Sequence, residues 1–125
     1  MILRSGVDLV EINRLAAVNP AIRQRFLRRV FTPAELAYCK DSNERLSGRF
    51  GVKEAASKVL GTGIGFVHWQ DIETLRGPAG EPQLVLHGNA EKVAVALGLT
   101  QWSVSITHSG PYALAFVVAL GEKEG

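Results

Sequence analysis

The stretch GRFGVKEAASKVLGTGIG, Gly48 to Gly65, joins a helical pattern to a glycine-rich loop. Glu54 and Lys58 stand four residues apart, so they share one face of the predicted helix and point toward the same neighbouring element. The glycines that follow let the backbone approach a bulky anion closely. A carboxylate, an ammonium group and an open loop together suit a magnesium-bound phosphate.

The same residues also fit a structural role. A glutamate followed four residues later by a lysine is a common stabilising pair on solvated helices. Gly61 is suited to end the helix, because glycine adopts the left-handed conformation of a helix C-terminus without strain. The choice between the two interpretations depends on the rest of the chain.

Segments on both sides of this helix predict an α+β domain. Capping residues, prolines and alternating apolar residues mark the expected elements. The expected helices run from about Leu9 to Val18, from Pro20 after an N-cap at Asn19, from Thr32 to about Cys39, from about Asn43 to Leu60 and from Ala90 to Leu97. The expected strands cover Ile2–Val7, Asp71–Leu75, Gln83–His87, Trp102–Thr107 and Tyr112–Leu120.

Length and composition predict a single domain over residues 1–125. The 125 residues are 46% hydrophobic, which is enough to bury one core. No run of about 18 apolar residues and no signal-peptide pattern occurs, so we expect a cytoplasmic protein without a membrane segment. The single Cys39 has neither a disulfide partner nor metal-ligand spacing, and we interpret it as an inert, partly buried residue.

A basic helix is predicted from Pro20, although the net charge of the chain is only +2. Ile22, Phe26 and Val30 recur with helical spacing and form its apolar side. Its outward side carries four arginines, Arg23, Arg25, Arg28 and Arg29. No RNA-recognition motif and no row of stacking aromatics accompanies them, so we predict an acidic protein surface as the partner and no nucleic acid.

Asp8 lies where the predicted first strand gives way to the predicted first helix, and it has two interpretations. With Glu11 three residues later it has the form of a helix capping box. Alternatively, its carboxylate shares a hard cation with Glu54, which requires the strand end and the main helix to be adjacent. The residues alone leave both open.

Three segments in this order resemble the stand-alone bacterial holo-acyl-carrier-protein synthases, the short class of phosphopantetheinyl transferases. They are GVDLVEINR from Gly6, the main stretch from Gly48, and SVSITHSGPYALAFVVAL from Ser103. The resemblance covers nearly the whole chain, although His68 to Thr100 holds no diagnostic motif. It implies the 4′-phosphopantetheinyl transferase fold, a small antiparallel sheet packed with a long central helix and several short helices.

The activity that the resemblance implies is transfer of 4′-phosphopantetheine from coenzyme A to a serine of an apo acyl carrier protein. The other product is adenosine 3′,5′-bisphosphate. In this family the matching positions make Asp8 and Glu54 the protein ligands of Mg²⁺. Lys58 would neutralise the pyrophosphate as a point charge. Glu54, directly or through a metal-bound water, is also the available base for the serine proton.

The resemblance implies further contacts to coenzyme A and to the carrier. His108, in SITHSGPYA, would donate a hydrogen bond to the pyrophosphate and belongs with Glu54 and Lys58 among the expected catalytic residues. Arg49 would bind the 3′-phosphate. The loop residues Gly61 and Gly63 are expected against coenzyme A. The acidic carrier would meet Arg14, Arg25 and Arg29.

The family also implies a homotrimer with active sites at the subunit boundaries. A small domain offers little concave surface of its own, and pockets commonly form where subunits meet. Four apolar residues of the predicted strands either line the contact between subunits or fill the core of one subunit. They are Val104, Ile106, Phe116 and Val118.

Two other functions fit the residues. Two acids, a lysine and a basic helix would serve another magnesium-dependent enzyme, a phosphodiesterase or nuclease. In a non-catalytic module, the arginines would bind an acidic protein and the remaining features would be structural.

Overall fold

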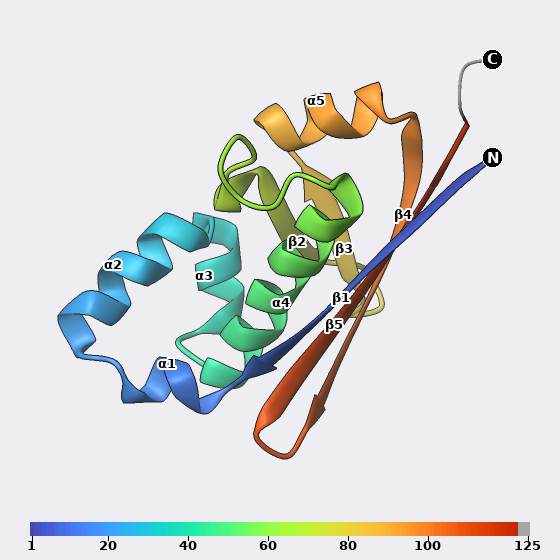
Figure 1. The fold of residues 1–125 in the computed structure, drawn as a ribbon. Helices are drawn as coiled ribbons and strands as arrows, with labels where there is room; N and C mark the ends of the chain where they lie inside the picture. Colours follow the sequence, from blue (N-terminus) through green and yellow to red (C-terminus); the bar gives the residue numbers. More distant parts are fainter. Residues whose placement is uncertain (123–125) are drawn as a thin grey trace.

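The computed structural model describes residues 1–122 and shows an α+β fold in which a long helix lies against a three-stranded sheet (Figure 1). The predicted fold class is therefore confirmed, and residues 123–125 of the predicted domain lie outside the described residues. The elements in chain order are β1 (Ile2–Glu11), α1 (Asn13–Ala17), α2 (Pro20–Val30), α3 (Pro33–Cys39), α4 (Asn43–Leu60), η1 (Trp69–Asp71), β2 (Ile72–Arg76), β3 (Pro82–Leu86), α5 (Gly88–Ala96), β4 (Leu99–Ser109) and β5 (Tyr112–Gly121).

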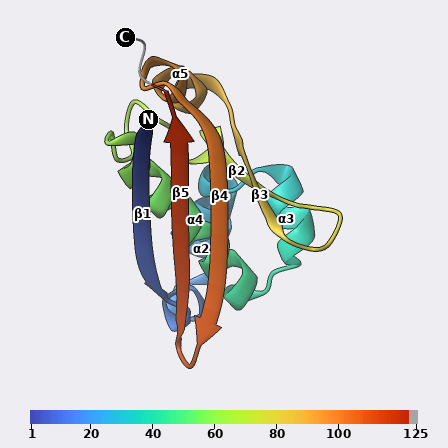
Figure 2. The same cartoon turned by 90° about the vertical axis from the view of Figure 1, so that its right-hand side faces the viewer.

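The larger sheet has the strand order β1-β5-β4, with both neighbours antiparallel to the central β5. Strands β2 and β3 pair antiparallel as a separate hairpin. Helix α4 covers one face of the larger sheet, while no helix of residues 1–122 lies on the other face (Figure 2). Only one face of the larger sheet therefore packs against the hydrophobic core.

Side chains of β5 alternate between the buried face and the exposed face of the sheet. Ala115 and Val117 are fully or almost fully buried and belong to the core under α4. Phe116 points to the other face and leaves 44% of its surface exposed. Val104 and Ile106 of β4 pack against the core, so of the four strand residues left open by the sequence these two are core residues.

Helix α4 has the predicted bounds, Asn43 to Leu60. The hydroxyl of Ser42 accepts a hydrogen bond from the backbone N–H of Arg45 at 3.2 Å and caps the helix N-terminus. Gly61 ends the helix in the left-handed region, with φ of +76°. The prediction that glycine stops the helix there is confirmed. Glycine suits this position because a residue with a Cβ would be strained in the left-handed conformation.

Strand β1 approaches α4 unusually closely at Gly6. A Cβ at this position would lie 2.1 Å from the carbonyl oxygen of Ala55 and 3.3 Å from Cβ of Lys58. Real Cβ atoms do not tolerate the first distance, so only glycine lets the strand and helix backbones pack at this spacing.

A buried ion pair fixes α4 on the side away from β1. The Lys53 ammonium donates to Oε1 of Glu35 at 2.7 Å and to the carbonyl of Ile72 at 2.5 Å, and neither charged side chain is exposed. Oε2 of Glu35 accepts from the backbone N–H of Thr74 at 2.9 Å. Burial lowers the pKa of Lys53, opposed by the Glu35 charge. The pair holds α3, α4 and β2 in one orientation.

The first strand and first helix differ from the prediction. Strand β1 continues to Glu11, which pairs with Tyr112, and α1 begins only at Asn13. Asp8 therefore lies inside a strand, and of its two interpretations the helix capping box with Glu11 is wrong. Pairing with the distant β5 extends the strand beyond the point that local capping signals indicate.

We predict that Gly6→Ala lowers the free energy of unfolding by about 1–3 kcal/mol or more, the cost of overpacking at a rigid contact. Denaturant unfolding measures the change, and Ser5→Ala on the exposed face of the same strand is the control. A Gly6→Ala protein as stable as the wild type would show that β1 and α4 are not held at this distance.

Candidate active site

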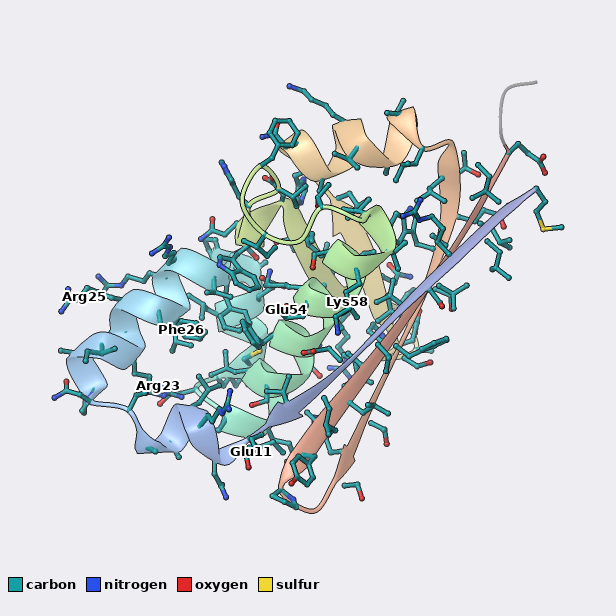
Figure 3. All side chains as sticks on the ribbon, viewed as in Figure 1. Glu11, Arg23, Arg25, Phe26, Glu54 and Lys58 are labelled. Carbon is teal, nitrogen blue, oxygen red and sulfur yellow. The ribbon has the colours of Figure 1, made fainter. Side chains whose placement is uncertain are left out.

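Asp8, Glu54 and Lys58 come together between β1 and α4. Nζ of Lys58 lies 3.5 Å from Oδ1 of Asp8 and donates a hydrogen bond to the carbonyl of Val7 at 2.8 Å. Figure 3 labels Glu54 and Lys58 on α4, the helix beside β1. The adjacency of strand and helix that a shared cation requires is therefore present, because Gly6 admits α4 two residues before Asp8.

Both carboxylates are held in an environment that opposes their charge. Burial raises the pKa of Glu54, the neighbouring Asp8 raises it further, and Lys58 opposes the shift. Burial likewise raises the pKa of Asp8 against the attraction of Lys58. A cation between the two acids would relieve both the desolvation and the mutual repulsion.

The donor set fits Mg²⁺ better than a softer metal. Two carboxylates supply hard oxygen ligands, and Mg²⁺ commonly takes one or two of these and completes its octahedron with water and phosphate oxygens. In residues 1–122 there is no group of three or more His, Cys, Asp or Glu side chains able to hold a metal. Any metal here would thus depend on oxygens from water or substrate.

A groove of about 760 Å³ opens beside the acidic pair, between the end of β1 and helices α1, α2 and α4. Its wall is mainly apolar, with Asp8 and Glu54 at one side and Arg14 on its border. Phe26 of α2 is among its lining residues and is labelled in Figure 3. The remaining lining residues are Leu9, Val10, Glu11, Leu15, Val18, Ile22, Phe50 and Tyr112.

The glycine loop after α4 is open to solvent. Gly61, Gly63 and Gly65 are all exposed, and at Gly63 an added Cβ would meet no atom within 4 Å. This open backbone follows Lys58 by one helical turn, as the sequence predicts for a loop that an anion approaches.

Arg49 lies on the opposite side of α4 from Glu54. Five residues along a helix correspond to a rotation of about 140°. The Arg49 guanidinium stacks 4.0 Å from the centre of the Tyr38 ring, and only 7% of the residue is exposed. Its Nε has no hydrogen-bond partner among residues 1–122. Within one chain, Arg49 therefore does not join the group formed by Asp8, Glu54 and Lys58.

His108 lies at the N-terminal end of α4. Its Nε2 is 3.1 Å from the carbonyl oxygen of Glu44, and its ring approaches Gly48. Glu54 follows Gly48 by six residues, a rise of about 9 Å along the helix. The structure thus separates the predicted residues into two sets, an acidic set with Lys58 next to β1 and a second set of Arg49 and His108.

The predicted carrier-binding arginines are at the surface. Arg14, Arg25 and Arg29 are exposed, and Arg25 extends from the outside of α2 in Figure 3. Nε of Arg14 is 3.5 Å from Oε2 of Glu11. Arg23 instead pairs with Asp41 and donates to Oδ1 of Asn43, so it serves to hold α2 against the start of α4.

Two features of the site were missed by sequence reasoning. The sequence pattern predicted the apolar side of α2 but no groove beside it, whereas Ile22 is 56% exposed and lines the groove together with Phe26. Arg4 was given no role, although residues 4, 6 and 8 must share one face of a strand. The period-two pattern of β1 was the available signal for Arg4.

Comparison with known proteins assigns the family. Residues 4–117 match the model of the 4′-phosphopantetheinyl transferase superfamily. The chain is 46% identical to holo-(acyl-carrier-protein) synthase of Herpetosiphon aurantiacus over 126 residues, covering 95% of this chain and 99% of that protein. It is 44% identical to the synthase of Koribacter versatilis, covering 94% and 98%.

Solved structures agree. The Helicobacter pylori holo-(acyl-carrier-protein) synthase in complex with coenzyme A superimposes with a TM-score of 0.84 at 32% identity, over 93% of this chain and 99% of that one. The Neisseria meningitidis synthase gives 0.83 at 31% identity, over 94% and 97%. The chain therefore belongs to the 4′-phosphopantetheinyl transferase superfamily, in the family of the holo-acyl-carrier-protein synthases. Within residues 1–122, none of the helices has the length and apolar character needed to cross a membrane.

We predict that Glu54→Gln, measured without metal at neutral pH, unfolds at the same temperature as the wild type or a higher one. A carboxyl whose pKa is raised in the folded state stabilises the fold when protonated, and this contribution is lost as the pH rises through the raised pKa. Glutamine removes the cost of the charge, so the difference from wild type should shrink as the pH falls.

The same variant should lose Mg²⁺ binding in calorimetric titration. Glu91→Gln, at an exposed glutamate of α5, is the control and should keep it. A Glu54→Gln protein that is less stable at neutral pH and still binds Mg²⁺ as the wild type does would contradict the proposed electrostatics of the pair.

Proposed function

We propose that the protein transfers 4′-phosphopantetheine from coenzyme A to a serine hydroxyl of an apo acyl carrier protein and releases adenosine 3′,5′-bisphosphate. The observation that carries this is the grouping of Asp8, Glu54 and Lys58 beside an open glycine loop and an apolar groove. Relatives named holo-(acyl-carrier-protein) synthase and structures of that enzyme with coenzyme A support the assignment.

Each of these residues has a task in the transfer. The serine oxygen attacks the β-phosphorus of the pyrophosphate, and the bond from that phosphorus to the bridging oxygen breaks as the nucleotide leaves. Lys58 neutralises the pyrophosphate as a point charge. Glu54 takes the serine proton, directly or through water, and its raised pKa makes it a better proton acceptor than an ordinary carboxylate.

Mg²⁺ is the metal that we propose for this site, held by Asp8 and Glu54. When bound, it would supply Lewis-acid stabilisation of the pyrophosphate oxygens. The contact between Asp8 and Lys58 supports this proposal, because it would join the metal-binding side of the site to its phosphate-binding side.

The carrier is proposed to dock over the groove and α2. Arg14 borders the groove and Arg25 lies on the exposed side of α2, so an acidic helix would meet positive charge around an apolar hollow. Arg29 is exposed one turn further along the same helix. This arrangement would bring the serine of the carrier toward Asp8 and Glu54 at the wall of the groove.

A homotrimer with its active sites between subunits accounts for two further features. The uncovered face of the sheet carries large exposed apolar side chains, Leu3, Val7, Leu9, Leu114 and Phe116. Such a face on a soluble domain marks a contact surface. In addition, Arg49 and His108 lie apart from the acidic set of their own chain, and we propose that a neighbouring copy supplies them to complete the coenzyme A site.

A cytoplasmic location is part of the proposal, since coenzyme A is an intracellular metabolite. The buried, unpaired Cys39, whose pKa burial raises to about 11, is consistent with a reducing compartment.

We predict that the protein with coenzyme A, Mg²⁺ and an apo acyl carrier protein increases the carrier mass by about 340 Da, the mass of the 4′-phosphopantetheine group. Intact-mass spectrometry measures the gain, and a carrier whose serine is replaced by alanine is the control. Hydrolysis of coenzyme A with an unmodified carrier would favour the magnesium-dependent phosphodiesterase. Carrier binding without any turnover would favour the non-catalytic module.

We predict that Arg25→Glu raises KM for the carrier severalfold at low salt, leaves KM for coenzyme A unchanged and flattens the salt dependence. Surface charge acts mainly on association and is screened by salt. Lys92→Glu reverses an exposed charge on α5 and is the matched control. Equal carrier kinetics for wild type and Arg25→Glu at low salt would remove α2 from the interface.

A further inference from the structure

Arg4 reaches the glycine loop from the strand that carries Asp8. The two side chains leave the same face of β1, with Gly6 between them, because residues of a strand alternate between its faces. A Cβ built at Gly61 would lie 3.0 Å from Nη2 of Arg4, and within residues 1–122 no other atom outside the adjoining residues comes within 4 Å. The Arg4 guanidinium thus lies directly beside this open glycine.

The charge of Arg4 is uncompensated within residues 1–122. No carboxylate there lies within 4.0 Å of its guanidinium, and its N–H groups form no hydrogen bond with the described residues. Lys58, by contrast, already contacts Asp8 and the carbonyl of Val7. Of the two cations at this end of α4, Arg4 is therefore the one with all its donors available.

A half-buried guanidinium with free donors next to exposed backbone is suited to a phosphate. Its fork of N–H groups matches two phosphate oxygens, which a lysine ammonium does not. The loop glycines leave the space that the anion needs: Gly63 has nothing within 4 Å of a built Cβ. The alternative role for Arg4 is to interact with the free carbonyl groups at the C-terminus of α4. In that role it would stabilise the helix and would not contribute to ligand binding.

We propose that Arg4 is a substrate-binding residue that contacts a phosphate group of coenzyme A at the glycine loop. This rests on the proposed function and adds to it a cation that lies outside the group formed by Asp8, Glu54 and Lys58. Coenzyme A offers two sources of phosphate here, its pyrophosphate and its 3′-phosphate, and both present the oxygens that Arg4 fits.

The test is calorimetric titration of the full-length protein with coenzyme A and with 3′-dephospho-coenzyme A, in Mg²⁺ and without carrier. Arg4→Gln removes the charge and keeps a hydrogen-bond donor, and Arg28→Gln on the exposed side of α2 is the matched control. We expect Arg4→Gln to bind coenzyme A about tenfold more weakly, as for loss of a charge-assisted hydrogen bond, and Arg28→Gln to bind as the wild type does.

The second ligand identifies the group. If the difference between wild type and Arg4→Gln disappears with 3′-dephospho-coenzyme A, Arg4 contacts the 3′-phosphate. If it persists, the contact is with the pyrophosphate, and either result supports the proposal. Equal affinity of wild type and Arg4→Gln for coenzyme A overturns it, even if Arg4→Gln melts at a lower temperature, since that combination shows a helix-stabilising role.

The mass assay separates this result from the proposed function. A wild-type protein that modifies the carrier, together with an Arg4→Gln variant that binds coenzyme A equally well, overturns the role of Arg4 alone. A wild-type protein that does not bind coenzyme A overturns both.

Discussion

The contact between Gly6 of β1 and the carbonyl of Ala55 in α4 sets the geometry on which the proposed active site depends. A backbone-to-backbone approach this close exists only where a residue has no side chain, and here a Cβ would come within 2.1 Å of the carbonyl oxygen. One consequence is that Asp8, two residues further along the strand, lies beside the helix that carries Glu54 and Lys58. The same spacing places Arg4, two residues before Gly6, at the open end of that helix. The missing side chain of Gly6 thus lets two acids, Asp8 and Glu54, and two cations, Arg4 and Lys58, gather at the proposed phosphate site.

The two flanks of α4 have different tasks. On one flank, the buried pair of Lys53 and Glu35 ties the helix to α3 and β2 and is fully satisfied by hydrogen bonds. On the other flank, Glu54 is charged at a cost, because burial and Asp8 both raise its pKa. The satisfied charges therefore lie on the flank away from β1, and the unrelieved charge of Glu54 lies on the flank beside β1. This is the expected distribution for a site that is completed by a cation and a substrate, since a strained arrangement persists only when its surroundings hold it in place.

Much of this fold can be predicted from local signals. The bounds of α4, the left-handed Gly61, the N-cap at Asn19 and the capping box of Thr32 and Glu35 all follow from residues close in sequence, and the structure confirms them. The length of β1 does not follow, because its last residues are held by pairing with β5 about a hundred positions later, which local capping signals cannot report. Asp8 and Glu54 were identified through the family motifs. That the strand carrying Asp8 lies beside the helix carrying Glu54 depends on three-dimensional packing. The groove and Arg4 depend on the same packing, since exposed apolar residues of α2 and an unpaired strand arginine acquire meaning only once their neighbours are known.

We propose that a working site combines Asp8, Glu54 and Lys58 of one chain with Arg49 and His108 of a neighbouring chain. The direct test is to assemble two variants together, Asp8→Asn and His108→Ala, each of which is expected to be inactive alone. The quantity measured is the rate at which the carrier serine is modified. In a ring of identical, head-to-tail contacts, random mixing at equal amounts should restore about a quarter of the sites, because each restored site needs one intact half from each variant. We expect mixed assemblies to regain about that fraction of wild-type turnover, while each variant alone remains inactive. Mixed assemblies as inactive as the separate variants would contradict it, since both halves would then have to belong to the same chain.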